Sequence, residues 1–326
     1  MTGLLARIRE QPPEVLEAIA HSMNVRASEP AMRAICARYM ARITLPEGAH
    51  VLEVGCGNGA ATKLIMQHVN PGRLVGIDPS STFVDMARET FAGEPRVSFA
   101  LGDAVATGQG DACFDLVIAH TVYSHLVDPE EALTEAHRVL RPGGQLVIFD
   151  GDFATLTVAL FDGDPLQAAV GGVLRNLVHA PYIMRRLPAL VTSARFSLHS
   201  VEPHGYVQTS SPDYLLTLLS RGSYAAVQAG EISQEVVDSF DREARRRVAN
   251  GTFYGAMLFL SLTACKGGDS ATLVARRRPR AERSTSDFCS IWQRIGRSLD
   301  ERCLSGCAGK VLPAISRSSQ CWCRKR

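Results

Sequence analysis

A turn with three glycines at alternate positions follows the first strongly apolar run of the chain, in the sequence HVLEVGCGNGAATKL at residues 50–64. Gly55, Gly57 and Gly59 can adopt positive φ angles, and without side chains they let a ligand approach the backbone closely. An ordinary tight strand–helix turn would also use glycine. However, ligands of α/β proteins bind at the carboxyl ends of such strands. The turn therefore predicts a ligand site in an α/β fold.

Strands and helices alternate from residue 50 onwards. Near-continuous apolar strands indicate a parallel sheet that is covered by helices on both faces. Ser80 or Ser81 is the expected cap of one helix, and Asp128 followed by Pro129 is the expected start of another. The expected strands are at 50–54, 73–77, 96–101, 114–120, 145–150, 196–208 and 252–265, and the expected helices are at 59–69, 80–92, 129–140 and 231–249.

The chain is predicted to have three parts. Residues 1–48 are expected to form a helical lid, and residues 49–266 the main α/β domain. Within that domain, residues 151–195 are mostly apolar and helix-like, and we expect them to form helices that cap a substrate. Residues 267–326 show neither helical nor strand periodicity and are rich in Arg, Ser and Cys, so they are expected to be a disordered basic tail.

Charge is distributed unevenly between these parts. Residues 1–266 carry 22 Lys and Arg against 28 Asp and Glu, a net charge of −6, whereas residues 267–326 carry 13 against 5, a net charge of +8. A mildly acidic main domain argues against nucleic-acid binding by that domain. No signal peptide is visible, and the longest apolar segment, 253–265, is too short to span a membrane. With few cysteines before the tail, we expect a cytoplasmic protein.

Two classes of ligand fit the glycine turn. The pattern G-x-G-x-x-A at 55–60, with Asp78 at the end of the next strand, matches a nicotinamide dinucleotide site in which the carboxylate binds ribose hydroxyls. Glu53, two residues before the first glycine, is a charge where a dinucleotide site usually keeps an apolar residue. It suits a ligand that carries a positive group.

Five segments extend this pattern in a fixed order: VLEVGCGNG at 51–59, VGIDPS at 75–80, LGDA at 101–104, FDLVIAHTVYSHL at 114–126 and VLRPGGQLVIFD at 139–150. In order and spacing they resemble the motifs of the class I S-adenosylmethionine-dependent methyltransferases. The resemblance is strong over residues 50–150 and weaker as far as Lys266. It implies a Rossmann-like, doubly wound, mostly parallel seven-stranded sheet with helices on both faces, and S-adenosyl-L-methionine as cofactor.

The resemblance also implies roles for individual residues. Glu53 would lie near the ammonium group of the cofactor, Asp78 would bind the ribose hydroxyls, and Asp103 would bind the adenine amino group. Pro79 would pack on the adenine, and His120 would face the methionine part. The other residues implied to contact the cofactor are Gly55, Cys56, Gly57, Gly59 and Ala104.

Two other classes of function stay open. An NAD(P)-dependent oxidoreductase would need a hydride-transfer apparatus, but none of the four lysines lies four residues after a tyrosine, as the short-chain dehydrogenases require. A non-catalytic cofactor-binding or RNA-associated protein could use the basic tail. Cysteines of the tail could ligate zinc, but the tail has no His and its CxC spacing is unusual for a finger.

Methyl transfer from a sulfonium mainly requires alignment of the acceptor and exclusion of water, with a base only where the acceptor must lose a proton. The candidate catalytic residues are Tyr123 and His125, with Asp150 and Asp152 as alternatives. No cluster has the spacing of metal ligands, so no metal is expected. The apolar segment 151–195 favours a small, largely hydrophobic acceptor, such as a natural-product or quinone-like metabolite.

Overall fold

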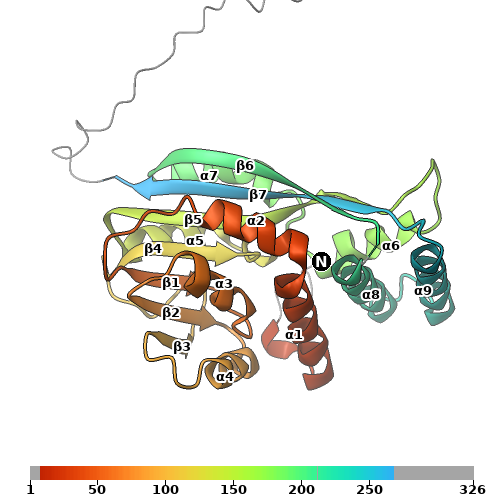
Figure 1. Cartoon of the computed structure of the whole chain (residues 1–326), viewed down its shortest axis with the longest axis horizontal. Helices are drawn as coiled ribbons and strands as arrows, with labels where there is room; N and C mark the ends of the chain where they lie inside the picture. The colour runs from red at the N-terminus through yellow and green to blue at the C-terminus, as the bar shows by residue number, and fades with distance from the viewer. Residues whose placement is uncertain (1–7, 211, 268–326) are drawn as a thin grey trace, which may run out of the picture. The chain divides into compact units, whose positions relative to one another are not determined.

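A seven-stranded sheet carries the fold in the computed structural model, which describes residues 8–210 and 212–267 (Figure 1). The strand order is β3-β2-β1-β4-β5-β7-β6. Strands β1 to β5 pair in parallel, and β7 is antiparallel to both β5 and β6, which confirms the predicted mostly parallel Rossmann-like sheet. The strands are β1 (His50–Val54), β2 (Arg73–Asp78), β3 (Val97–Leu101), β4 (Phe114–His120), β5 (Leu140–Thr157), β6 (Phe196–Gln208) and β7 (Gly255–Lys266).

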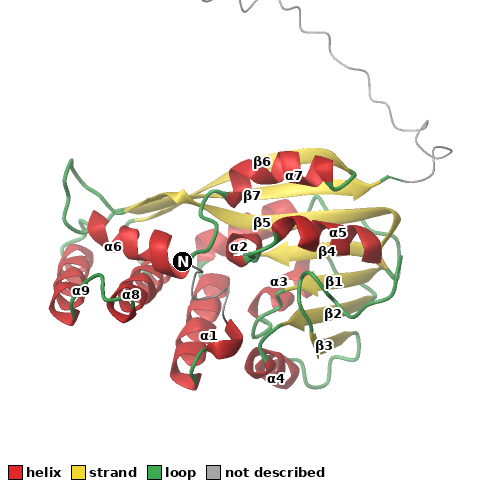
Figure 2. Cartoon of the chain, turned by 180° about the vertical axis from the view of Figure 1, so that it is seen from behind, coloured by secondary structure: helices red, strands yellow, loops and turns green. Residues whose placement is uncertain are grey.

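Helices cover the sheet on both faces, because successive strand side chains point to opposite sides. One face, with Val51, Leu116 and Phe149, packs against α2 and α3. The other face, with Leu52 and Val117, packs against α5 and α7 (Figure 2). Burial on both sides explains the near-continuous apolar strands. These helices are α2 (Pro30–Met40), α3 (Ala60–His68), α5 (Pro129–Val139) and α7 (Ile183–Ser193).

Two helix starts follow signals in the sequence. Helix α4 (Ser81–Thr90) is capped by Ser80, whose Oγ accepts a hydrogen bond from the Phe83 N–H at 3.4 Å. Helix α5 begins at Pro129, as predicted, with acidic residues in its first turn. The Asp128 side chain makes no capping hydrogen bond there, so that part of the prediction was wrong. Proline at the first position and the acidic first turn are enough to start this helix.

The N-terminal helix α1 (Pro13–Ser28) packs against α3, α4 and α8. The predicted helical character of the N-terminal segment is thus confirmed for α1 and α2. A cluster of buried apolar side chains joins the N-terminal segment with α1 to helix α4. It consists of Ile8, Val15, Leu16, Ile19, Ala20 and Phe83.

A second group of helices packs together beyond the long ends of β5, β6 and β7 (Figure 1). Two glycines let its helices approach closely: a Cβ on Gly172 would lie 2.6 Å from the carbonyl oxygen of Gly222. Any side chain at Gly172 would force the two segments apart. The group comprises α6 (Gln167–Gly172), the π-turn η3 (Val173–Leu177), α8 (Asp213–Gln228) and α9 (Gln234–Ala249).

The structure corrects the expectations for the second half of the chain. Residues 151–157, expected to be helical, continue strand β5, and α8 was not predicted. Helix α7 packs on β5, β6 and β7, so that only α6 and η3 of the segment 151–195 are available to cap a substrate. An apolar run such as FATLTVAL suits a buried strand and a buried helix equally. All but Gly267 of the predicted tail lies outside the described residues.

A buried ion pair ties α9 to the loop before α6. The Arg247 guanidinium donates from Nη1 and Nη2 to the two Asp164 carboxylate oxygens, both at 2.7 Å, and the side chains are 4% and 0% exposed. Asp164 also accepts backbone hydrogen bonds from Leu160 and Leu166. The hydrogen bonds from Arg247 hold the pKa of Asp164 well below its usual range.

Arg247→Met is expected to lower the free energy of unfolding by about 3–5 kcal/mol, because it leaves the Asp164 carboxylate buried without its cation. Urea unfolding followed by circular dichroism would measure the loss. The control is Arg245→Met on the same helix, whose side chain is 79% exposed. It should change the free energy of unfolding by less than about 0.5 kcal/mol. A similar small effect of Arg247→Met would contradict the prediction.

Candidate functional site

The carboxyl ends of β1, β2 and β4 border a cavity of about 430 Å³, hereafter the outer cavity. It lies where the strand order reverses between β1 and β4, which is where open α/β sheets bind their ligands. Residues of the N-terminal segment, among them Arg9 and Met23, form part of its wall. Six of the residues predicted from the sequence line it: Gly55, Asp78, Pro79, Asp103, Ala104 and His125.

The glycine turn has the backbone conformation that the sequence predicted. Gly55, Gly57 and Gly59 have φ angles of 68°, 54° and 83°, in the left-handed region that favours glycine. A Cβ on Gly55 would lie 2.5 Å from Val122 Cγ2, and one on Gly57 would lie 2.7 Å from Met23 Sδ. The turn is therefore enclosed by the loop after β4 and by α1, and only a bare backbone fits there.

Asp78 holds the turn in place at the end of β2. Its Oδ2 accepts a hydrogen bond from the Gly57 N–H at 2.9 Å, and its Oδ1 accepts one from the Ser80 N–H at 2.9 Å. Burial raises the pKa of Asp78 to about 6, although both hydrogen bonds oppose this shift. At neutral pH the carboxylate is ionised, and its remaining lone pairs can accept hydrogen bonds from hydroxyl groups of a ligand.

Asp103, in the loop after β3, pairs with an arginine that the sequence did not single out. Arg9 Nη2 lies 3.0 Å from Asp103 Oδ2, and the two side chains are 60% and 39% exposed. An ion pair this exposed contributes at most about 1 kcal/mol to the stability of the fold, so a ligand can displace Arg9 from Asp103 at little cost in free energy. No motif surrounds Arg9, and only the packing of the N-terminal segment brings it to the site.

Glu53 is fully buried below the glycine turn and does not line the outer cavity. Its Oε2 accepts a hydrogen bond from Thr62 Oγ1 at 2.6 Å, while its Oε1 is buried without a partner. Burial raises the pKa of Glu53 to about 8. A buried polar atom without a partner is rare in native proteins. Cys56 is also buried and packs against α4, away from the outer cavity.

His120 is bonded inside the fold. Its Nδ1 lies 2.8 Å from Tyr39 Oη, and its ring stacks on Phe149 with centroids 4.8 Å apart. Burial lowers the pKa of His120 well below its usual value, so the ring is neutral. His120 does not line the outer cavity, and its predicted contact with the cofactor stays a prediction.

The two predicted catalytic residues share one short 3₁₀ turn, Tyr123–His125, but the structure does not bring them together. Tyr123 is buried in the core formed with α5 and α7. His125 lines the outer cavity, and its Nδ1 is buried without a partner. Burial, reinforced by nearby cations, lowers the pKa of His125 to about 3, so the imidazole is neutral and can accept a proton.

Both alternative bases are engaged in hydrogen bonds within the fold. Asp150 accepts hydrogen bonds from the Ser124 N–H at 2.9 Å, from Ser124 Oγ at 3.0 Å and from the Gly151 N–H at 2.8 Å. Asp152 Oδ2 accepts from Arg185 Nε at 2.7 Å. Asp150 therefore positions the turn that carries His125.

A smaller cavity of about 40 Å³, hereafter the inner cavity, adjoins the outer one. The two share Met23, Thr121 and His125. Thr121 has a φ angle of 58°, which is rare for a β-branched residue and typical of strained functional positions. The sequence analysis missed this cavity, because half of its wall comes from α1 and from the unpredicted α8. Other lining residues are Arg26, Phe153, Leu177, Tyr214, Leu218 and Arg221.

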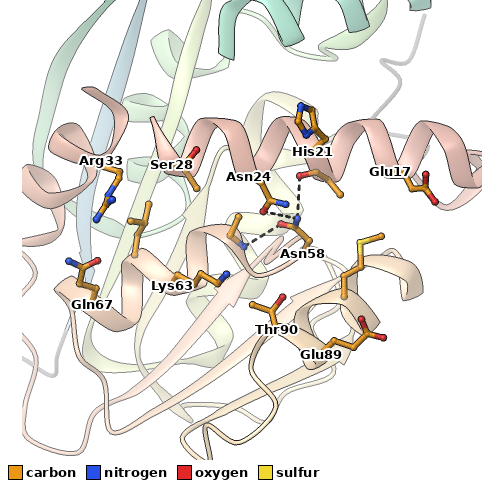
Figure 3. A pocket seen from close by; sticks show the side chains of 15 residues that line it. Glu17, His21, Asn24, Ser28, Arg33, Asn58, Lys63, Gln67, Glu89 and Thr90 are labelled. Atoms are coloured by element: carbon orange, nitrogen blue, oxygen red, sulfur yellow. Dashed lines mark hydrogen bonds between the residues drawn. The ribbon is translucent and has the colours of Figure 1, made fainter. Parts of the chain in front are cut away.

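Another hollow, of about 820 Å³, lies between α1, α3 and α4 (Figure 3). Asn58 borders it and ties the glycine turn to α1: its Nδ2 donates to the Ala20 carbonyl at 3.2 Å and to Asn24 Oδ1 at 3.1 Å. This hollow is away from the strand ends, and no predicted site residue lines it.

In the part of the chain that the structure describes, no group of three or more His, Cys, Asp or Glu side chains is placed to hold a metal ion. The helices among residues 8–210 and 212–267 are all too short or too polar to cross a membrane.

Two curated relatives are similar to this chain in sequence. An uncharacterized 37.1 kDa protein in transposon TN4556 of Streptomyces fradiae is 33% identical over 217 residues, 64% of this chain and 60% of its own length. The demethylmenaquinone methyltransferase of Lactiplantibacillus plantarum is 35% identical over 115 residues, 34% of this chain and 48% of its own. The matched segments thus span about half of these relatives.

Solved structures are similar in fold. A Bacillus halodurans C-125 protein described as a candidate methyltransferase has a TM-score of 0.53 at 17% identity, over 72% of this chain and 99% of its own. The [4+2]-cyclase SpnF has a TM-score of 0.52 at 18% identity, over 82% and 98%. Residues 52–148 match a family model described as a methyltransferase domain. Residues 52–148 thus belong to the methyltransferase-domain family, and the glycine turn and the strand order agree with that assignment.

Proposed function

We propose that this chain transfers a methyl group from S-adenosyl-L-methionine to a small, largely hydrophobic metabolite. The observation that carries the proposal is the pair of adjoining cavities, one beside the glycine turn and one beyond Thr121 and His125. A methyltransferase must hold its donor and its acceptor side by side. The outer cavity, of about 430 Å³, has the size of a ligand site, and the inner cavity, of about 40 Å³, can take a small group of the acceptor.

The residues present fit the cofactor. Asp78 would bind the ribose hydroxyls. Asp103 would release Arg9 and bind the adenine amino group, and Pro79 would pack on one face of the adenine. Glu53 has an unpartnered buried oxygen that suits an ammonium group. The bare backbone at Gly55 would lie against the methionine part. When bound, the cofactor supplies a methyl group that is already activated by its sulfonium.

The protein's own task is to align the acceptor and exclude water. Alignment of two reactants can contribute on the order of 7–11 kcal/mol to lowering the barrier. His125 stands where the two cavities meet. Its neutral imidazole would position the acceptor by a hydrogen bond, while its low pKa makes it a poor general base. Tyr123 lines neither cavity, so the proposed contact with the acceptor is His125 alone.

Apolar side chains support a small hydrophobic acceptor. Phe153, Leu177, Val178 and Leu218 line the inner cavity. The relative named as a demethylmenaquinone methyltransferase supports a quinone-like acceptor by similarity alone. The family assignment favours methyl transfer over the nicotinamide-dependent chemistry, and the RNA-binding hypothesis concerns a tail outside the described residues.

Asp78→Asn is expected to weaken binding of S-adenosylhomocysteine, the product form of the cofactor, about 10- to 100-fold, because a hydrogen bond to a charged group contributes about 1.5–3 kcal/mol. Isothermal titration calorimetry measures the affinity. Asp85→Asn on α4, where the carboxylate is 66% exposed, is the matched control and should bind as the wild type does. If the wild type, Asp78→Asn and Asp85→Asn bind S-adenosylhomocysteine with equal affinity, Asp78 does not contact the cofactor.

The affinity for S-adenosylhomocysteine is expected to rise from pH 6.5 to pH 8, by up to about tenfold per pH unit. The reason is that the Glu53 carboxyl, with a pKa raised to about 8, must lose its proton to bind an ammonium group. Glu53→Gln should flatten this rise, while a decline below about pH 6 persists because Asp78 becomes protonated there. A wild-type affinity independent of pH over this range would contradict the role of Glu53.

Transfer of a labelled methyl group from S-adenosyl-L-methionine into the small-molecule fraction of a cell extract tests the reaction itself. The wild type should label at least one small metabolite, which mass analysis can identify, and Asp78→Asn should label it far more slowly. Label that enters only protein or RNA would refute a small-molecule acceptor.

A further inference from the structure

Two arginines from different helices line the inner cavity, Arg26 of α1 and Arg221 of α8. The cavity is otherwise walled mainly by apolar and aromatic side chains, among them Phe153, Leu177 and Leu218. Both side chains are half-buried, and the Arg221 Nε is fully buried without an acceptor, which is costly. The contacts of the two guanidinium groups therefore indicate which ligand the inner cavity can bind.

Within the described residues, neither guanidinium has a carboxylate partner. Arg221 donates from Nη1 to Ser22 Oγ at 3.1 Å, and its Nε is buried with no acceptor. The Arg26 guanidinium carbon lies 6.0 Å from the centre of the Tyr214 ring. The nearby Asp241, which lines a separate surface hollow together with Arg221, pairs with Arg245.

Other arginines that meet buried carboxylates in this chain are paired. Arg247 binds Asp164, and Arg185 binds Asp152, each at 2.7 Å. Arg26 and Arg221 have no such carboxylate among the described residues.

The two charges change the protonation behaviour of their surroundings. Burial, with repulsion from Arg26, lowers the pKa of Arg221 to about 10. Arg221 and Arg26 also help to lower the pKa of His125 to about 3. The cavity thus has an excess of positive potential beside the proposed methyl-transfer position.

The size of the cavity restricts the anion that fits. The inner cavity, of about 40 Å³, has room for a small polar group and not for a whole ligand. A planar carboxylate is such a group, and it matches the fork of a guanidinium. A nucleic-acid backbone cannot enter such an enclosed space.

We propose that Arg26 and Arg221 bind a carboxylate of the methyl acceptor, so that the acceptor is a small organic acid with a hydrophobic body. This inference rests on the proposed methyl transfer and adds an anionic anchor to the predicted hydrophobic acceptor. The carboxylate occupies the inner cavity between α1 and α8. The body of the acid extends past Thr121 and His125, which line both cavities.

The test uses the full chain saturated with S-adenosylhomocysteine and four matched probe pairs: hexanoate, octanoate, benzoate and phenylacetate, each with its neutral amide. Calorimetry should show at least one acid binding at least tenfold more tightly than its amide. Arg221→Met and Arg26→Met should each abolish that preference, whereas the exposed Arg245→Met should keep it. If no acid binds more tightly than its amide, or if the preference survives both substitutions, the inference is overturned.

Two further measurements separate this inference from its alternatives. The affinity of Arg221→Met for S-adenosylhomocysteine should equal that of the wild type. If the wild type itself does not bind S-adenosylhomocysteine, the proposed function is refuted, and this result says nothing about the arginines. Arg221→Met should also raise the melting temperature of the ligand-free protein by about 2 °C or more, because an unpaired charge is removed. A lower melting temperature would assign Arg221 a structural role and contradict the inference.

Discussion

The hydrogen bond from the Gly57 N–H to the Asp78 carboxylate is the contact on which the site depends. It joins the turn after β1 to the end of β2, and it requires the positive φ angle that glycine provides. The carboxylate must be buried to make this bond, and burial raises its pKa to about 6. One contact therefore fixes the shape of the turn and also places an ionised acceptor at the wall of the outer cavity.

Charge of opposite sign is separated along the passage formed by the two cavities. Asp78 and Asp103 line the outer cavity, where the methyl donor is proposed to bind, while Arg26 and Arg221 line the inner cavity. A sulfonium donor is cationic, and the proposed acceptor is anionic. The arrangement would draw each ligand to its own end and disfavour the reverse placement.

The sequence predicted the fold well where local signals and topology agree. The strands β1 to β4, the glycine turn and the place of Asp78 follow from apolar runs, glycine chemistry and the known position of ligands at strand ends. The sequence could not predict which side chains share a cavity. His125 and Tyr123 are two residues apart, yet one faces the ligand space and the other the core.

The missed residues have a common physical origin. Arg9, Arg26 and Arg221 reach the site through the packing of α1 and α8, which no motif near them signals. The extension of β5 to Thr157 was missed because its apolar residues fit a helix equally well. In both cases tertiary contacts between distant segments decide the outcome.

The antiparallel strand β7 has a consequence for how the protein is made. It is the last strand of the described chain, yet it lies inside the sheet between β5 and β6. During synthesis β6 has no neighbour to pair with until residues 255–266 have left the ribosome, so the sheet cannot close in the order of translation. The ribosome-bound chain would carry two open strand edges, which are the surfaces that molecular chaperones protect from aggregation.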